Sequence, residues 1–141
     1  MTTISQTART SHAVAEQFVE RLGRQDPDGI QELFAEEIDW YVPGSAALPW
    51  TGRRTRREEV AAFFTTMWPY YVPGRSRVVL ERVVVHGADV VLLASFTHTI
   101  VANGREFTTP AALHLAVEDG RIVRLHLYED TLTIAQAFTA G

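Results

Sequence analysis

The sequence predicts an α+β domain, in which helices pack on a curved antiparallel sheet and enclose an apolar pocket. Apolar residues recur at helical spacing in the first half of the chain. The second half alternates as strands do, and the dipeptides Asn103-Gly104 and Asp119-Gly120 mark hairpins between them. Helices segregated against an antiparallel sheet make an α+β fold. Because such a sheet twists and curls, its concave face must be filled by helices or by a ligand.

The first two elements are expected to be helices. The first helix is indicated by apolar residues at helical spacing: Val14, Phe18, Val19 and Leu22. Ser11 can cap its start. Gly23 lies near its end, and Asp-Pro-Asp-Gly at 26–29 predicts a turn. A short second helix should follow, with one face made of Ile30, Leu33 and Phe34.

A strand and a third helix come next. Residues 37–42 alternate as a strand, which Pro43 and Gly44 end, and residues 43–54 are expected to be a loop. Residues 57–68 predict a helix with a buried face made of Val60, Phe63, Phe64 and Met67. Pro69 and Pro73 then break the chain.

The rest of the chain predicts a meander of strands at 76–86, 89–101, 105–117 and 121–129. A Gly-Ala turn at 87–88 joins the first two strands. A short helix or arm is expected over 131–138. With no linker or repeat in the sequence, we expect residues 1–141 to form one domain with its core at about 12–138.

Composition excludes several classes of function. The 141 residues are 46% hydrophobic and carry a formal net charge of -4, which makes nucleic acid an unfavourable partner. There is no cysteine, and no stretch approaches the ~20 apolar residues of a membrane helix. We therefore expect a cytoplasmic protein without a membrane partner. Four arginines form one basic cluster: Arg53, Arg54, Arg56 and Arg57. We interpret this cluster as a solvated helix start or as an anion site.

Several segments resemble a known family. Residues 18–22, 28–30 and 32–36 are similar to the opening of the nuclear transport factor 2-like (NTF2-like) superfamily. Trp-Tyr-Val-Pro-Gly at 40–44 resembles its SnoaL-like, ketosteroid-isomerase-related branch, as do Gly52 and residues 58–64, 119–123 and 128–131. The resemblance implies a cone-shaped α+β barrel, or cystatin-like roll. It also implies chemistry of the polyketide-cyclase type and a place in bacterial secondary metabolism, although this fold hosts many functions.

The residues that carry acid/base chemistry in two related enzymes are apolar here. By resemblance to ketosteroid isomerase, the base would fall at Val42 and the oxyanion donors at Phe18 and at Leu113 or Ala112. By resemblance to limonene epoxide hydrolase, the reacting groups would fall at Ala94, Phe96 and Leu127, with Trp40 and Val42 on the first strand. Both reactions are disfavoured. These positions instead predict a pocket for a small hydrophobic molecule, lined by Phe18, Trp40, Val42, Trp50, Phe63, Met67, Ala94, Phe96, Leu113, Leu127 and Tyr128.

Three polar residues near the predicted pocket are candidate catalysts. His98 shares a strand face with Phe96 and could act as a base near pH 7, or could simply be hydrogen-bonded at a strand end. Parity with Leu127 places Glu129 on the pocket side and Asp130 on the other, although a bend at the strand end would exchange them. Asp130 resembles the catalytic aspartate of SnoaL-type cyclases, or it caps the helix that follows.

No metal or cofactor is expected, because the five histidines lack ligand spacing and no phosphate loop occurs. The face of the sheet that points away from the pocket is also fairly apolar, which predicts a homodimer through that outer face. Asp39 and Tyr41 should lie on it. Two functions stay open: a cofactor-independent enzyme of cyclase or isomerase type that acts on a carbonyl compound, and a non-catalytic binding or dimerisation module.

Overall fold

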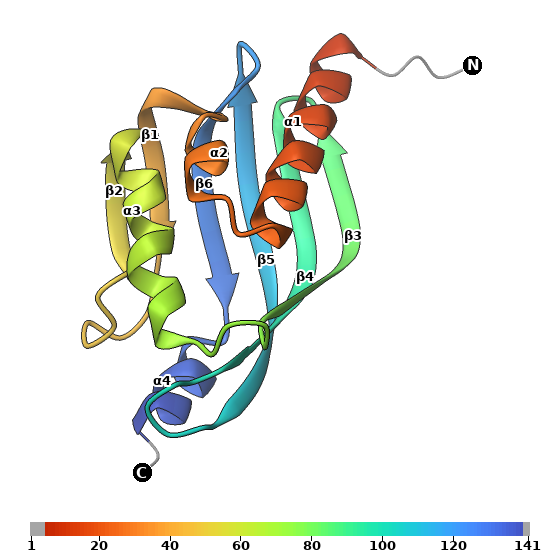
Figure 1. Ribbon diagram of the computed structural model, residues 1–141. Coiled ribbons are helices and arrows are strands. Elements are labelled where there is room, and N and C mark those ends of the chain that lie inside the picture. The colour runs from red at the N-terminus through yellow and green to blue at the C-terminus, as the bar shows by residue number, and fades with distance from the viewer. Residues whose placement is uncertain (1–4, 140–141) are drawn as a thin grey trace.

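The computed structural model describes residues 5–139, which form helices on one face of a single sheet (Figure 1). In chain order the elements are α1 Gln6–Gly23, α2 Pro27–Gln31, β1 Phe34–Val42, β2 Gly52–Arg56, α3 Glu58–Met67, the 3-10 helix η1 Trp68–Tyr70, β3 Arg77–His86, β4 Asp89–Thr99, β5 Glu106–Glu118, β6 Arg121–Glu129 and α4 Thr131–Thr139. This order confirms the predicted α+β class.

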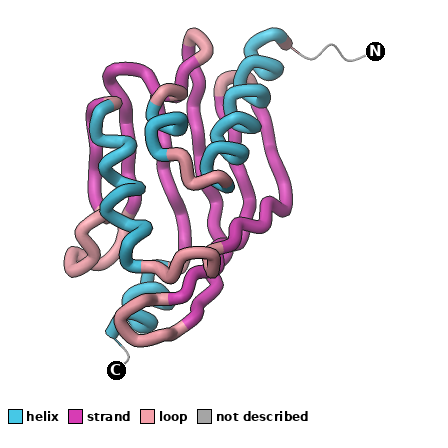
Figure 2. Tube along the Cα trace, viewed as in Figure 1, coloured by secondary structure: helices cyan, strands magenta, loops and turns pink. Residues whose placement is uncertain are grey.

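The sheet has six strands in the order β2-β1-β6-β5-β4-β3, and it is curved without closing (Figure 1). Its neighbouring strands are antiparallel with one exception, because β1 and β6 run parallel. The sequence shows hairpins but not how β1 joins the meander, so this parallel pair was not predicted. Helices α1, α2 and α3 cover the concave face, while α4 lies beyond the end of β6 (Figure 2).

The first helix begins earlier than predicted. Ser5 caps α1 by accepting a hydrogen bond from the Ala8 amide, so the prediction of Ser11 as the cap was wrong. Ser11 is a buried helix residue, and its hydroxyl lies 2.8 Å from the Gly87 carbonyl in the β3–β4 turn. The first turn of α1 is polar and exposed, so apolar periodicity could not reveal it.

Two further boundaries differ from the prediction. The segment 26–29 starts α2, with Asp26 as its N-cap, and Phe34 belongs to β1 and not to a helix face. Part of the predicted 43–54 loop is β2, which pairs with β1. The basic cluster therefore lies mostly on an edge strand and not at a helix start. Charged side chains protect such edges from further pairing, and they hide the alternation that marks a strand.

The second half agrees with the prediction. The predicted strands match β3 to β6 within about two residues, and α4 starts at Thr131 as expected. Asp119 and Gly120 both have positive φ, 50° and 74°, which the tight β5–β6 hairpin requires. The long strands β4, β5 and β6 therefore form the rigid back wall of the concave face.

Aromatic residues fill the space between this wall and the helices. The Trp40 side chain on β1 is 1% exposed and contacts Phe34, Phe63 and Phe64 edge-on or tilted. Phe18 of α1 packs against Phe34 with ring centroids 6.5 Å apart. This cluster fixes α1 and α3 on the sheet.

Gly29→Ala should destabilise the protein by about 1 kcal/mol, the typical value of a helix cap. The Gly29 amide donates to Asp26 Oδ1, and an added Cβ would collide with the Asp26 carboxylate and displace it. Gly23→Ala is the matched control, because an added Cβ there meets no atom within 4 Å. Urea unfolding of both variants checks the prediction, and equal stabilities would contradict it.

Candidate functional site

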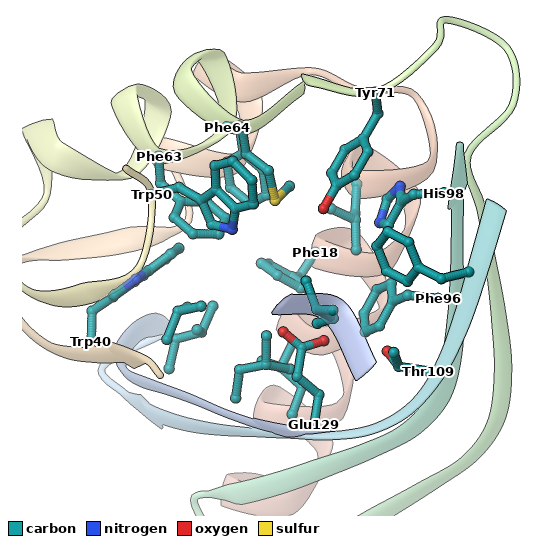
Figure 3. Close-up of a pocket in the computed structure, with 18 residues that line it drawn as sticks. Phe18, Trp40, Trp50, Phe63, Phe64, Tyr71, Phe96, His98, Thr109 and Glu129 are labelled. Carbon is teal, nitrogen blue, oxygen red and sulfur yellow. The ribbon is translucent and has the colours of Figure 1, made fainter. Parts of the chain in front are cut away.

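A cavity of about 80 Å³ lies between the concave face of the sheet, α1, α3 and α4 (Figure 3). Its wall is mainly aromatic and aliphatic. The lining residues are Phe18, Leu22, Trp40, Val42, Trp50, Phe63, Phe64, Met67, Tyr71, Phe96, His98, Phe107, Thr109, Leu113, Leu125, Leu127, Glu129 and Ile134. The polar side chains in this wall are few, as in sites that bind largely apolar small molecules.

Most residues predicted to bind substrate lie in this wall, but two do not. Ala94 is 7% exposed and belongs to the buried inner face of β4, outside the cavity lining. Tyr128 is 59% exposed on the opposite face of β6, where it faces away from the cavity. Its neighbours Leu127 and Glu129 both line the cavity, so the alternation of the strand excludes Tyr128 from it.

Glu129 brings a carboxyl group into this apolar space. Burial raises the pKa of Glu129 to about 7, and the nearby Thr109 hydroxyl acts in the opposite direction and lowers it. Figure 3 shows the carboxyl directed toward the middle of the cavity. A carboxyl group with a pKa near the working pH can both accept and return a proton. It is therefore the cavity residue best suited to proton transfer.

Asp130 has a different place. Its carboxylate accepts hydrogen bonds from the Thr133 amide at 3.0 Å and from the Thr133 hydroxyl at 2.6 Å, which lowers the pKa of Asp130. The side chain is exposed and caps α4. The structure thus contradicts the placement of Asp130 in the site and agrees with its alternative interpretation as a cap.

His98 lines the cavity on β4 and is held by its neighbours. Its Nδ1 lies 2.8 Å from Ser76 Oγ in a hydrogen bond, and its ring stacks on Tyr71 with centroids 4.1 Å apart. Burial lowers the pKa of His98 to about 4, so the imidazole is neutral at pH 7. A group with so low a pKa is a weak base, and His98 is better suited to hydrogen bonding than to the predicted role of base.

His98 and Glu129 face the same cavity without touching. They lie on β4 and β6, and β5 runs between these strands. Backbones two strands apart are separated by roughly 10 Å. The two side chains can therefore contact opposite ends of one small molecule.

Tyr71 adds a hydrogen-bond donor that the sequence did not single out. Burial, with a smaller effect of the Glu129 charge, raises the pKa of Tyr71, so its phenol stays protonated. Figure 3 shows the hydroxyl pointing into the cavity. Tyr71 was not among the predicted site residues, because no periodicity between residues 69 and 76 fixes the orientation of a side chain.

One more polar atom of the wall residues is buried without a partner. Trp40 Nε1 makes no hydrogen bond within residues 5–139, whereas the Thr109 hydroxyl acts on the nearby Glu129 carboxyl. Buried polar groups are normally satisfied, so a ligand with an acceptor atom can pair with Trp40 Nε1. Parity with Phe107 on β5 would have revealed Thr109, which the sequence analysis missed.

Outside the cavity, acidic and histidine side chains form pairs on the outer face. His114 lies 2.8 Å from Asp89, and His126 lies 2.9 Å from Asp39. Asp39 thus lies on the predicted face. The described part of the chain contains no group of three or more potential metal ligands. It also contains no helix long and apolar enough to cross a membrane.

Comparison with solved structures identifies the same fold. An NTF2-like protein of unknown function from Burkholderia pseudomallei K96243 has a TM-score of 0.83 and 24% identity, over 93% of this chain and 98% of that one. A protein classed as a SnoaL-like polyketide cyclase from Jannaschia sp. CCS1 has a TM-score of 0.81 and 20% identity, over 100% of this chain and 99% of that one. A protein classed as an isomerase from Rhodopseudomonas palustris has a TM-score of 0.73 and 16% identity, over 100% of both chains.

At these identities the likeness concerns the fold alone. No curated protein matches the sequence. A family model for the SnoaL-like domain matches residues 15–125, which is more than half of the chain. The protein therefore belongs to the SnoaL-like domain family.

Proposed function

We propose that the protein is a cofactor-independent enzyme, related to cyclases and isomerases, that moves a proton on a small hydrophobic carbonyl compound. The observation that carries this proposal is the Glu129 carboxyl, which lines an apolar cavity and has a pKa raised to about 7. The carboxyl is directed into an apolar cavity, and the nearby Thr109 hydroxyl does not offset the effect of burial on its pKa. Strongly shifted pKa values of this kind cluster at functional sites.

The proposed reaction begins at Glu129. Its carboxylate removes a proton from the carbon next to the substrate carbonyl, and the electron pair of the broken C–H bond moves toward the carbonyl oxygen. Tyr71, which keeps its proton, and His98 can donate hydrogen bonds to that oxygen. The enolate then takes the proton back from Glu129 at another carbon. Alternatively, its carbon attacks a second carbonyl of the same molecule, and the alkoxide that forms takes the proton from Glu129.

The apolar wall supports either outcome. Rings such as Phe63 and Phe96 hold a flat substrate by contact, and positioning by itself can accelerate ring closure strongly. Exclusion of water strengthens hydrogen bonds to the developing oxyanion. The names of two structural neighbours, a cyclase and an isomerase, agree with this class of reaction. The cytoplasmic location and the independence of a cofactor stay predictions.

We also propose a homodimer formed through the outer face of the sheet. Exposed apolar side chains lie there on several strands, including Val84 on β3, Leu93 on β4 and Tyr128 on β6. Leu93 is opposite Ala112, which in turn is opposite Tyr128, so this row crosses three strands. A second copy of the same surface would cover the row, since symmetric dimers use one patch twice.

Glu129→Gln should slow deuterium exchange at the carbons next to the carbonyl of a flat cyclic ketone, such as 2-indanone in D₂O, by roughly 100-fold or more. The amide cannot accept the proton. Asp130→Asn is the matched control, because the neighbouring carboxylate is exposed and asparagine also caps helices. NMR of the ketone measures the rate. A melting shift with ketone but no catalysed exchange by the wild type would favour the binding module instead.

The stability difference between wild type and Glu129→Gln should depend on pH. The pKa of Glu129 rises from 4.5 to about 7 on folding, so its favourable contribution is complete below about pH 4.5 and is lost as the pH rises through 7. The wild type should lose about 2 to 3 kcal/mol relative to the variant between pH 5 and pH 8. Both proteins contain His98, so its contribution to the pH dependence cancels in the difference. Urea unfolding of both proteins across this pH range checks the prediction. A difference in unfolding free energy that does not change with pH would contradict the burial of the Glu129 carboxyl.

Leu93→Arg should convert the dimer to a monomer, because it places a charge in the proposed interface. Val101→Arg is the control, since Val101 is exposed in the β4–β5 turn and not on the outer face. Light scattering after gel filtration gives the mass of each protein. A monomeric wild type, or a dimer that Leu93→Arg leaves intact, would contradict the proposed interface.

A further inference from the structure

Ser76 and His98 connect the cavity to the surface. Ser76 directly precedes β3, and since Arg77 pairs with Thr97, it lies beside His98 on the next strand. Its Oγ is 2.8 Å from His98 Nδ1. Ser76 also lines a surface groove of about 420 Å³, while His98 lines the inner cavity. The imidazole therefore has one nitrogen committed to Ser76 and the other available to the cavity.

The orientation of this ring is fixed by stacking. Tyr71 covers one side of it at 4.1 Å with an interplanar angle of 12°. Phe96 lies nearly parallel to it at 6.5 Å, and Phe107 is tilted against it at 5.8 Å. Figure 3 shows His98 between Tyr71 and Phe96 at the edge of the cavity. A ring held in this way keeps its Nε2 at one place in the wall.

A neutral imidazole carries one proton, so the hydrogen bond at Nδ1 decides what Nε2 offers to a ligand. Within residues 5–139 the only hydrogen bond of the Ser76 hydroxyl is the one to this ring. Donation to Nδ1 pairs the hydroxyl proton with the protein, whereas acceptance from Nδ1 would leave that proton to solvent in the groove. Glu129 is the carboxyl of the cavity wall, and its negative charge favours an N–H over a lone pair on Nε2.

We propose that Ser76 is a positioning residue that donates to His98 Nδ1 and holds the imidazole as the Nε2–H tautomer, so that His98 presents a hydrogen-bond donor to an acceptor oxygen of the ligand. This inference rests on the proposed function and deepens it. The ligand is a neutral molecule whose carbonyl oxygen faces His98 and Tyr71 while its acidic C–H faces Glu129. An ionised carboxylate ligand would be repelled by Glu129.

The tautomer can be measured without any ligand. In ¹⁵N-labelled wild-type protein at pH 7, long-range ¹H–¹⁵N correlation should show a protonated Nε2 and an unprotonated Nδ1 for His98, assigned by comparison with His98→Gln. Ser76→Ala should shift the ring toward a mixture of the two tautomers. Ser76→Thr, which keeps the hydroxyl, should restore the wild-type pattern. Ser95→Ala is the control, because Ser95 is a nearby β4 serine that bonds to Glu81 instead.

A protonated Nδ1 in the wild type would overturn the inference, and so would a tautomer that Ser76→Ala leaves unchanged. The second readout is ketone exchange, in which Ser76→Ala should lower the rate about tenfold, the value of one hydrogen bond. The melting temperature of Ser76→Thr shows whether any loss is only structural. Since the tautomer is read without substrate, its failure is distinguishable from a failure of Glu129→Gln to slow exchange.

Discussion

Curvature of the sheet is the constraint on which the rest of this protein depends. A curved sheet that does not close leaves a concave face that α1, α2 and α3 do not fill completely. The remaining space is the cavity, and it is apolar because the inward residues of β4, β5 and β6 also form the hydrophobic core. Any polar side chain that points inward at the cavity end of the sheet is therefore desolvated.

Desolvation gives the three titratable side chains of the wall different properties. It raises the pKa of Glu129 toward neutrality, lowers the pKa of His98 and keeps Tyr71 protonated. One carboxyl that can exchange a proton then faces two neutral groups that can hydrogen-bond. In the proposed reaction, this arrangement separates the proton-transfer end from the oxygen-binding end without a charged partner, by the distance that β5 places between the two side chains.

The last strand shows how finely alternation sorts side chains. Leu127 and Glu129 enter the cavity, Tyr128 lies on the exposed outer face, and Asp130 leaves the sheet to cap α4. The adjacent residues Glu129 and Asp130 therefore have different environments, since one lines the cavity and the other caps a helix. The same alternation on β1 buries Trp40 and places Asp39 beside His126 on the outer face.

The sequence by itself determined the α+β class and the meander, because periodicity and Asn-Gly or Asp-Gly turns act over short distances. Strand parity also placed His98 toward the pocket, and Glu129 as well unless the strand end bent. It could not reveal β2 or the start of α1, since charged or polar exposed segments carry no apolar period. Only the tertiary structure decided that Ser76 meets His98, that Tyr71 turns inward and that Asp130 caps α4. Those outcomes depend on strand register, on the path of a loop and on the bend at a strand end. Each of these is fixed by contacts between segments that are distant in the sequence.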